Sequence, residues 1–203
     1  MNRISQYLVY PIVRFFNIFF FDVEFKNPEG FKPIIGKPAL IIANHISYYD
    51  SFLLRLNHYS VGLSLYFMGA KKFKSPYMRF MWITGIVPVV YKLFGVFLVY
   101  PGLGIEKNLE MPRRILSKNN QIFIFPEGSV NKTGILKPFK LGSATLSSMT
   151  SAPVLPVSYR EVCESGKRRK IMITLGEVMN FTPGMNPEEI NKQLEDRVRQ
   201  MLS

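Results

Sequence analysis

The chain has 203 residues, of which 47% are hydrophobic and 14% aromatic, a composition that excludes a disordered polymer and suits one domain with a sizeable core. Lysine and arginine total 26 against 14 acidic residues, so the formal charge of +12 indicates an anionic partner: a nucleic acid, a lipid surface or a phosphorylated substrate. The single cysteine, Cys163, excludes an intrachain disulfide, and we assign it no role.

The first element in chain order is an apolar segment at residues 4 to 21, which is about as long as a membrane-spanning helix. Pro11, Arg14 and Asn17 interrupt it, and it lacks the small-residue cleavage pattern of a signal peptide. Its apolar residues leave no polar face for solvent, which favours contact with lipid headgroups over packing on the domain. We therefore predict a membrane-associated helical segment over residues 1–30 and one domain over residues 31–203.

A second apolar run covers residues 80 to 100. Gly85, Pro88, Lys92 and Gly95 divide it into short pieces. These interruptions predict a buried helix, a connector and a core strand rather than a membrane span. We expect the protein to rest on a membrane without crossing it.

Short apolar runs alternate with helical patterns along the chain. The predicted strands cover residues 39–43, 64–68, 96–100, 121–125, 153–157 and 170–175. The predicted helices cover residues 48–57, 76–84, 105–118, 141–150 and 186–202, and Asn186 is the expected N-cap of the last. The alternation predicts an α/β fold, with a mixed, largely parallel sheet flanked by helices.

Polar residues follow two of these predicted strands. Asn44 and His45 follow the strand at 39–43, and Glu127 and Gly128, in the sequence FPEGS, follow the strand at 121–125. Ligands of α/β sheets gather beyond the carboxyl ends of the strands, so both groups are expected in one crevice.

Asp50 stands five residues after His45, near the start of a predicted helix. With Ser47 as N-cap it completes a capping-box pattern, which needs no chemistry. A first-turn side chain also leans back toward the helix N-terminus, so the carboxylate can reach the imidazole of His45. Taken alone the pattern favours the cap, and Asp50 can serve in both roles.

The two motifs together resemble the glycerolipid acyltransferase family. That family has a first block of Asn-His, four residues and Asp, and a third block of Phe-Pro-Glu-Gly followed by Ser or Thr; both are present here at 44–50 and 125–129. The sequence PFK (138–140) followed by Gly142, and VLPV (154–157) with Pro156, resemble further family features. The resemblance covers about residues 35 to 160.

The chain departs from the family in its second block, which usually ends in an arginine that holds the acceptor's phosphate. One alignment, over residues 95–104, places Pro101 at that position, and the alternative, over residues 85–92, places Tyr91 or Lys92 there. A lysine lacks the planar fork with which arginine grips phosphate. Five residues are candidates to supply a cation instead: Lys92, Arg113, Arg114, Lys137 and Lys140.

The resemblance implies transfer of a fatty acyl group from acyl-CoA or acyl carrier protein to a hydroxyl of a lysophospholipid-type acceptor, with lysophosphatidic acid as the first expectation. His45 would be the general base and Asp50 would orient it. The acceptor would be bound by four residues, Asn44, Glu127, Gly128 and Ser129. Neither a metal nor a cofactor is required.

The implied partners are membrane lipids and the acyl donor, and the implied location is the cytoplasmic face of the inner or plasma membrane. The basic clusters at 71–74, 113–114 and 167–170 suit phosphates, an acidic carrier protein or anionic headgroups. Two alternatives stay open: acylation of a lyso-lipid without phosphate, and a catalytically silent member that binds lipid. A nucleic-acid module is disfavoured because the sequence has no helix-turn-helix, aromatic platform or zinc-ligand spacing.

Overall fold

The computed structural model describes residues 11, 14–15, 19–47, 49–51, 53–54, 65–70, 76–100, 102–162 and 169–203. These residues form a seven-stranded sheet in the order β1-β7-β6-β2-β5-β3-β4. The strands are β1 (Phe21–Lys26), β2 (Ala39–Ala43), β3 (Leu65–Ala70), β4 (Val96–Val99), β5 (Gln121–Ile124), β6 (Val154–Val162) and β7 (Arg169–Leu175). Neighbouring strands are parallel except β6 and β7, so the predicted mixed, largely parallel sheet is confirmed.

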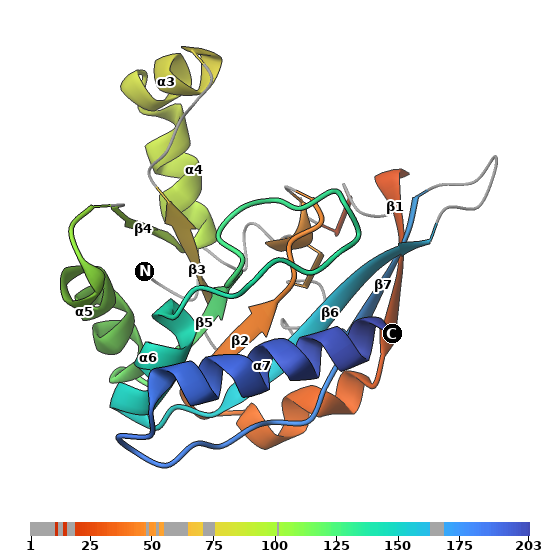
Figure 1. Ribbon diagram of the computed structural model, residues 1–203. Coiled ribbons are helices and arrows are strands. Elements are labelled where there is room, and N and C mark those ends of the chain that lie inside the picture. The colour runs from red at the N-terminus through yellow and green to blue at the C-terminus, as the bar shows by residue number, and fades with distance from the viewer. Residues whose placement is uncertain are drawn as a thin grey trace.

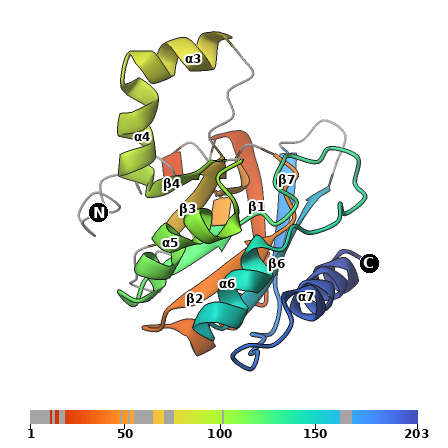
Figure 2. The same ribbon diagram turned by 60° about the vertical axis from the view of Figure 1, so that its left-hand side comes forward.

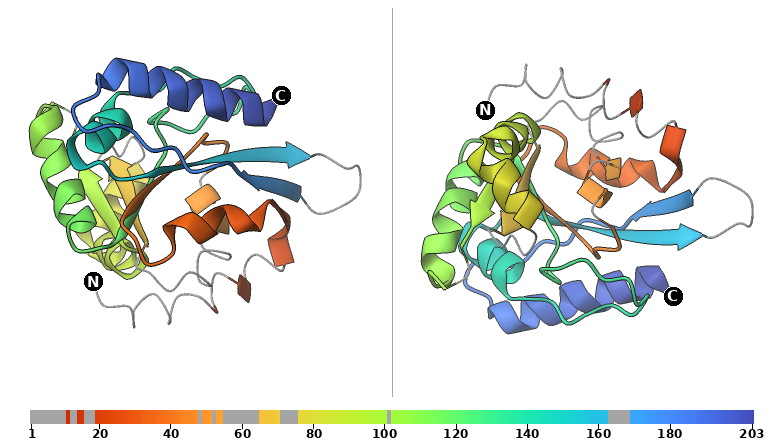
Figure 3. Two further views of the ribbon diagram at one scale, coloured as in Figure 1. Left: turned by 90° about the horizontal axis from the view of Figure 1, so that it is seen from below. Right: turned by 90° about the horizontal axis from the view of Figure 1, so that it is seen from above.

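Helices cover both faces of the sheet (Figures 2 and 3). They are the 3-10 helix η1 (Pro28–Ile34) and the α-helices α3 (Pro76–Ile83), α4 (Ile86–Phe94), α5 (Ile105–Leu116), α6 (Gly142–Thr150) and α7 (Pro187–Leu202). Alternate side chains of β2 point to opposite faces. Leu40 and Ile42 belong to the core beneath α5, α6 and α7, while Ile41 belongs to the core beneath η1.

The C-terminal helix α7 follows its sequence pattern closely. The side chain of Asn186 accepts a hydrogen bond of 2.9 Å from the backbone N–H of Glu188, which confirms the predicted N-cap. Ile190, Leu194 and Val198 are fully buried and form the apolar stripe that docks the helix on the domain.

The sheet begins earlier in the chain than the sequence indicates. β1 pairs in parallel with β7 from Phe21↔Arg169 to Lys26↔Thr174, and η1 continues from it onto the core. Residues 21–30, expected in the N-terminal membrane segment, are thus part of the domain. The strand was missed because its sequence, FDVEFK, is short and directly follows a longer apolar run.

The region between β3 and β4 departs most from expectation. Residues 80–100 were predicted to hold a buried helix and a core strand, but α3 and α4 form a bent two-helix arm, here called the α3–α4 hairpin, that projects from the body of the molecule (Figures 1 and 2). Large apolar side chains of this hairpin are exposed: Phe80, Ile83, Ile86, Val89, Val90 and Leu93. β4 is the half-buried edge strand of the sheet. Val87 of α4 is buried, whereas these six side chains are not covered by the part of the chain that the structure describes.

Some predictions fall partly or wholly outside the described residues. Of the helix predicted at 48–57, residues 50–51 and 53–54 are helical. His58, Cys163, the basic cluster at 71–74 and residues 167–168 lie outside. Within the described ranges, no helix combines the length and apolar character that crossing a membrane requires.

Candidate active site

The site lies where the parallel strands β2 and β5 end side by side. Ile42 pairs with Ile124, so the residues that follow each strand leave the sheet together. The backbone N–H of His45 donates a hydrogen bond of 2.8 Å to Oε1 of Glu127, and the backbone N–H of Asn131 donates one of 2.6 Å to the carbonyl of His45. The two motifs predicted to share a crevice are therefore in direct contact.

The carboxylate of Asp50 is fully buried and holds the imidazole of His45. Its Oδ2 accepts from Nδ1 of His45 at 3.0 Å and from the backbone N–H groups of Ile46 and Ser47 at 2.8 and 2.9 Å. Its Oδ1 accepts from the hydroxyl of Ser47 at 2.7 Å. Four donors thus fix the carboxylate, and the reach from Asp50 to His45 predicted from their spacing is confirmed.

The same contacts cap the helix that begins at Asp50. Oγ of Ser47 accepts from the backbone N–H of Tyr49 at 3.2 Å, while Asp50 accepts from the backbone N–H of Ser47, which is the reciprocal pattern of a capping box. The two interpretations of Ser47-x-x-Asp50 are therefore compatible, because one carboxylate serves the cap and the histidine together.

The imidazole of His45 lies flat against the ring of Phe125. The ring centroids are 3.7 Å apart and the planes differ by 10°. Because Nδ1 faces Asp50, the other ring nitrogen, Nε2, is left for a ligand. Phe125 was not singled out from the sequence, although it is the first residue of the FPEGS motif.

His45 and Phe125 line a cavity of about 520 Å³, here called the His45 cavity. Gly128, Ser129 and Lys140 also line it. Gly128 adopts a left-handed conformation with φ of +71°, and a Cβ at this position would collide with the side chain of Lys140. The left-handed conformation favours glycine at this turn, and the absence of a Cβ lets the end of the Lys140 side chain lie against the backbone.

Glu127, predicted to bind the acceptor, is not among the described residues that line the His45 cavity. Its carboxylate is buried: Oε1 accepts from His45, and Oε2 accepts from the side-chain amide of Asn131 at 2.7 Å and from the backbone N–H of Lys137 at 3.1 Å. Glu127 thus ties the His45 turn to the loop after β5. Nothing in the sequence pattern indicated Asn131 as its partner.

Asn44 also faces the protein interior rather than the cavity. Its side chain donates to the carbonyl of Tyr159 at 2.9 Å and accepts from the backbone N–H of Tyr159 at 2.7 Å. The hydroxyl of Tyr159 in turn donates to the backbone carbonyl of Asp50 at 2.9 Å. Burial, with a smaller effect of the nearby Asp50 charge, raises the pKa of Tyr159 well above its usual range, so the hydroxyl remains a donor.

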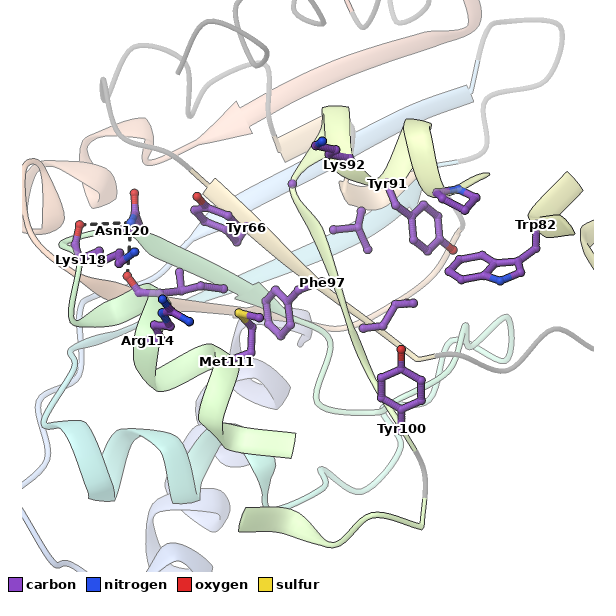
Figure 4. A pocket seen from close by; sticks show the side chains of 15 residues that line it. Tyr66, Trp82, Tyr91, Lys92, Phe97, Tyr100, Met111, Arg114, Lys118 and Asn120 are labelled. Carbon is purple, nitrogen blue, oxygen red and sulfur yellow. Dashed lines mark hydrogen bonds between the residues drawn. The ribbon is translucent and has the colours of Figure 1, made fainter. Parts of the chain in front are cut away.

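The predicted phosphate-binding cations are divided among different surfaces. Only Lys140 lines the His45 cavity, and Lys137 contacts Oγ of Ser129 at 3.4 Å and the carbonyl of Val130 at 3.2 Å nearby. Lys92 and Arg114 line a separate hollow between α4, β4 and α5, here called the edge pocket (Figure 4). Arg113 lines a third depression.

The sequence missed one further polar group of the His45 cavity. Ser143 lies in the first turn of α6, and its buried Oγ has no hydrogen-bond partner among the described residues. A buried hydroxyl without a partner is uncommon in folded proteins and indicates a place for a polar ligand group.

The chain is similar in sequence to known proteins. Residues 22–160 match the family model described as acyltransferase. Human 1-acyl-sn-glycerol-3-phosphate acyltransferase beta is 25% identical over 163 residues, which cover 79% of this chain and 55% of that protein. The 1-acyl-sn-glycerol-3-phosphate acyltransferase of Haemophilus influenzae is 26% identical over 198 residues, which cover 94% of this chain and 73% of that protein.

The fold is similar to that of a solved structure. The crystal structure of the 1-acyl-sn-glycerophosphate (LPA) acyltransferase from Thermotoga maritima matches with a TM-score of 0.69 and 21% identity, over 98% of this chain and 80% of that chain. The chain spans about half the length of the human relative. Because the family model covers residues 22–160, well over half of the chain, the protein belongs to the acyltransferase family.

Proposed function

We propose that the protein is an O-acyltransferase that moves a fatty acyl group from a thioester donor, acyl-CoA or acyl carrier protein, to the free hydroxyl of lysophosphatidic acid, giving phosphatidic acid. The observation that carries the proposal is the His45–Asp50 pair, held at 3.0 Å beside a cavity of about 520 Å³ in a chain of the acyltransferase family. The names of the human and Haemophilus relatives support the choice of acceptor.

In the proposed reaction, Nε2 of His45 takes the proton of the acceptor hydroxyl as the oxygen attacks the thioester carbonyl carbon. Asp50 holds Nδ1–H and stabilises the imidazolium that forms. When the tetrahedral intermediate collapses, the carbon–sulfur bond breaks and the imidazolium returns the proton to the leaving thiolate. The steps use neither a metal nor an acyl-enzyme.

The acceptor's phosphate is proposed to sit between Lys140 and the N-terminus of α6. Both line the same cavity as His45, and the free hydroxyl of Ser143 lies in the first turn of that helix. Leu141, the N-cap residue, has no side-chain acceptor for the first N–H groups, and helix N-termini favour anions. Lys140 would thus supply the charge that the arginine of the second block supplies elsewhere in the family.

The protein is proposed to act while resting on a membrane. The exposed apolar residues of the α3–α4 hairpin, together with exposed Phe15, Phe19 and Phe20, form surfaces that suit lipid contact. No acidic residue stands between residues 51 and 105, whereas basic residues stand at Arg55, Lys71, Lys72, Lys74, Arg79 and Lys92. Such a charge balance complements an anionic leaflet.

The test uses purified protein on anionic vesicles with a labelled acyl thioester, offered either as acyl-CoA or on acyl carrier protein. Acceptors with and without phosphate are compared for the wild type and His45→Ala. His58→Ala, which removes the only other histidine of the chain, is the matched control. We expect labelled phosphatidic acid from the wild type and His58→Ala alone. Equal inactivity of all three proteins with every donor and acceptor would leave a lipid-binding protein without catalysis.

A further inference from the structure

The edge pocket is a second hollow of about 680 Å³, and no residue that lines it also lines the His45 cavity. It lies between α4, the edge strand β4 and α5 (Figure 4). Its volume is within the range of pockets that hold small molecules, roughly 300 to 1,000 Å³. The reaction proposed at His45 does not involve the edge pocket.

One end of the edge pocket is aromatic. Trp82 of α3, Tyr91 of α4 and Tyr100 after β4 gather there, and the rings of Trp82 and Tyr91 meet edge to face with centroids 6.1 Å apart (Figure 4). Phe97 and Met111 continue the apolar lining toward the middle. Trp82 stands between the exposed Phe80 and Ile83 in the sequence, so this end adjoins the apolar hairpin.

The other end is cationic. Arg114 of α5 and Lys118, in the turn that follows α5, lie there beside Tyr66 and Asn120, and Lys92 lies at the upper rim (Figure 4). None of these three cations forms an ion pair with a described residue, and no carboxylate is among the described residues that line the pocket. Burial raises the pKa of Tyr66, so its hydroxyl stays protonated and can donate a hydrogen bond.

We propose that the edge pocket binds an anionic phospholipid of the membrane, with its phosphate at Arg114 and Lys118 and one acyl chain along Phe97 toward Trp82. The separation of charge from aromatic surface matches the two ends of such a molecule. A free inorganic anion would leave the aromatic end empty, and a neutral lipid would leave the cations without a partner. The site is distinct from the acceptor site, and its occupation does not depend on acyl transfer.

The position of the pocket also suits this ligand. If the α3–α4 hairpin rests in lipid, the aromatic end faces the acyl-chain region, and Arg114 and Lys118 face the headgroups. A bound lipid would bridge the hairpin and the domain, which touch along α4 and β4. The pocket would then help to hold the hairpin at a fixed angle to the sheet.

The experiment measures binding directly and uses the full chain carrying His45→Ala, so that turnover cannot consume the ligand. The chain has one tryptophan, Trp82, which lines the pocket. The probe is a short-chain phosphatidic acid brominated on one chain, kept below its micelle concentration, because bromine quenches tryptophan at contact. Inorganic phosphate and the matching brominated diacylglycerol are the two comparison ligands.

The variants isolate the cationic end. Arg114→Gln with Lys118→Gln is expected to raise the dissociation constant for the brominated phosphatidic acid at least about tenfold, because two charge-assisted contacts are lost. The single variants Arg114→Gln and Arg113→Gln each remove one positive charge and differ in that only Arg114 lines the pocket. Arg113→Gln is expected to change the constant less than about twofold, and Arg114→Gln is expected to change it more. Arg114→Lys should retain most of the affinity. All three residues changed are exposed, so the fold is expected to persist.

Saturable quenching that the double variant weakens and Arg113→Gln does not would support the site. Three results would overturn it: absence of quenching, equal weakening by Arg113→Gln and Arg114→Gln, and equal binding of the diacylglycerol. Displacement by inorganic phosphate at the same concentration as the lipid would show an anion site only and would also overturn it. None of these outcomes depends on whether His45 is a general base.

Discussion

The backbone N–H of His45 donates to Oε1 of buried Glu127 at 2.8 Å, so the two motifs of the site are joined through a carboxylate that does not reach the cavity. We therefore propose that Glu127 is a positioning residue. Glu127→Gln turns an amide group toward donors of His45, Asn131 or Lys137, and each donor left without an acceptor costs about 1–3 kcal/mol. We expect a lower melting temperature and a kcat reduced about 10- to 100-fold, with KM little changed. A raised KM at unchanged stability would instead indicate contact with the acceptor.

Asp50→Asn should distinguish the role of Asp50 in capping the helix from its proposed role in orienting His45. The amide oxygen can keep part of the capping contacts, so we expect a loss of stability of about 1 kcal/mol. It cannot stabilise an imidazolium as a carboxylate does, so kcat should fall about a thousandfold or more. Chemical denaturation and steady-state kinetics on one preparation measure both quantities. A variant that loses stability and keeps its kcat would reduce Asp50 to a helix cap.

Lys140→Met tests the proposed phosphate position. The variant should raise KM for lysophosphatidic acid at least about tenfold, because a charge-assisted contact is lost. KM for a lyso-lipid without phosphate should change little, and Lys140→Arg should restore binding of the phosphate-bearing acceptor. Equal effects on both acceptors would place the phosphate elsewhere.

Tyr159→Phe should alter the pH dependence of stability. The raised pKa means that the folded protein retains the phenolic proton at pH values where the unfolded chain, with a pKa near 10, loses it. The stabilisation is therefore complete below about pH 10 and decreases as the pH rises above it. The wild type should lose stability between about pH 9 and 11 more steeply than Tyr159→Phe, in which the other titrating groups are unchanged. Parallel melting curves over that range would contradict the assignment.

Ile83→Asp tests the membrane role of the α3–α4 hairpin. Ile83 is 82% exposed in α3, so a charge there should leave the fold intact while weakening binding to anionic vesicles severalfold. Ile135→Asp is the matched control, since Ile135 is 72% exposed in the loop after β5 and makes the same change of charge. Vesicle co-sedimentation measures both variants. Equal weakening would mean that net charge, and not the hairpin, governs binding.

The strands at the centre of the sheet and the residues that follow them were predicted from the sequence, because their local apolar pattern agrees with the way the strands pair. β2 and β5 are short apolar runs at the centre of the sheet, and the polar residues after them meet because parallel neighbours end at the same edge. The spacing indicated that Asp50 can reach His45, because a first-turn side chain leans back toward the helix N-terminus, and the structure confirms this reach. The spacing alone favoured a helix cap, and the FPEGS motif was needed to expect a role in the site.

Other features could not be predicted from the sequence, because each depends on residues or elements that lie far away along the chain. The apolar residues of 80–100 were interpreted as core, but whether an apolar helix is buried depends on what the fold places beside it. The hydrogen-bond partners of the Glu127 carboxylate could not be identified from the local sequence, because they include His45, which is 82 residues away. Lys92 and Arg114 are plausible phosphate ligands by charge, and only the topology places them in a different pocket from Lys140.

The contacts of Tyr159 carry a consequence for the order in which the protein becomes active during synthesis. Tyr159 holds the side chain of Asn44 and the backbone of Asp50, residues made more than a hundred positions earlier. A nascent chain that has not yet released β6 (Val154–Val162) from the ribosome lacks these three hydrogen bonds and the strand that borders β2. We expect fragments that end before β6 to be inactive even though they contain both motifs. The growing chain would then become catalytically active only after most of the domain has been synthesised.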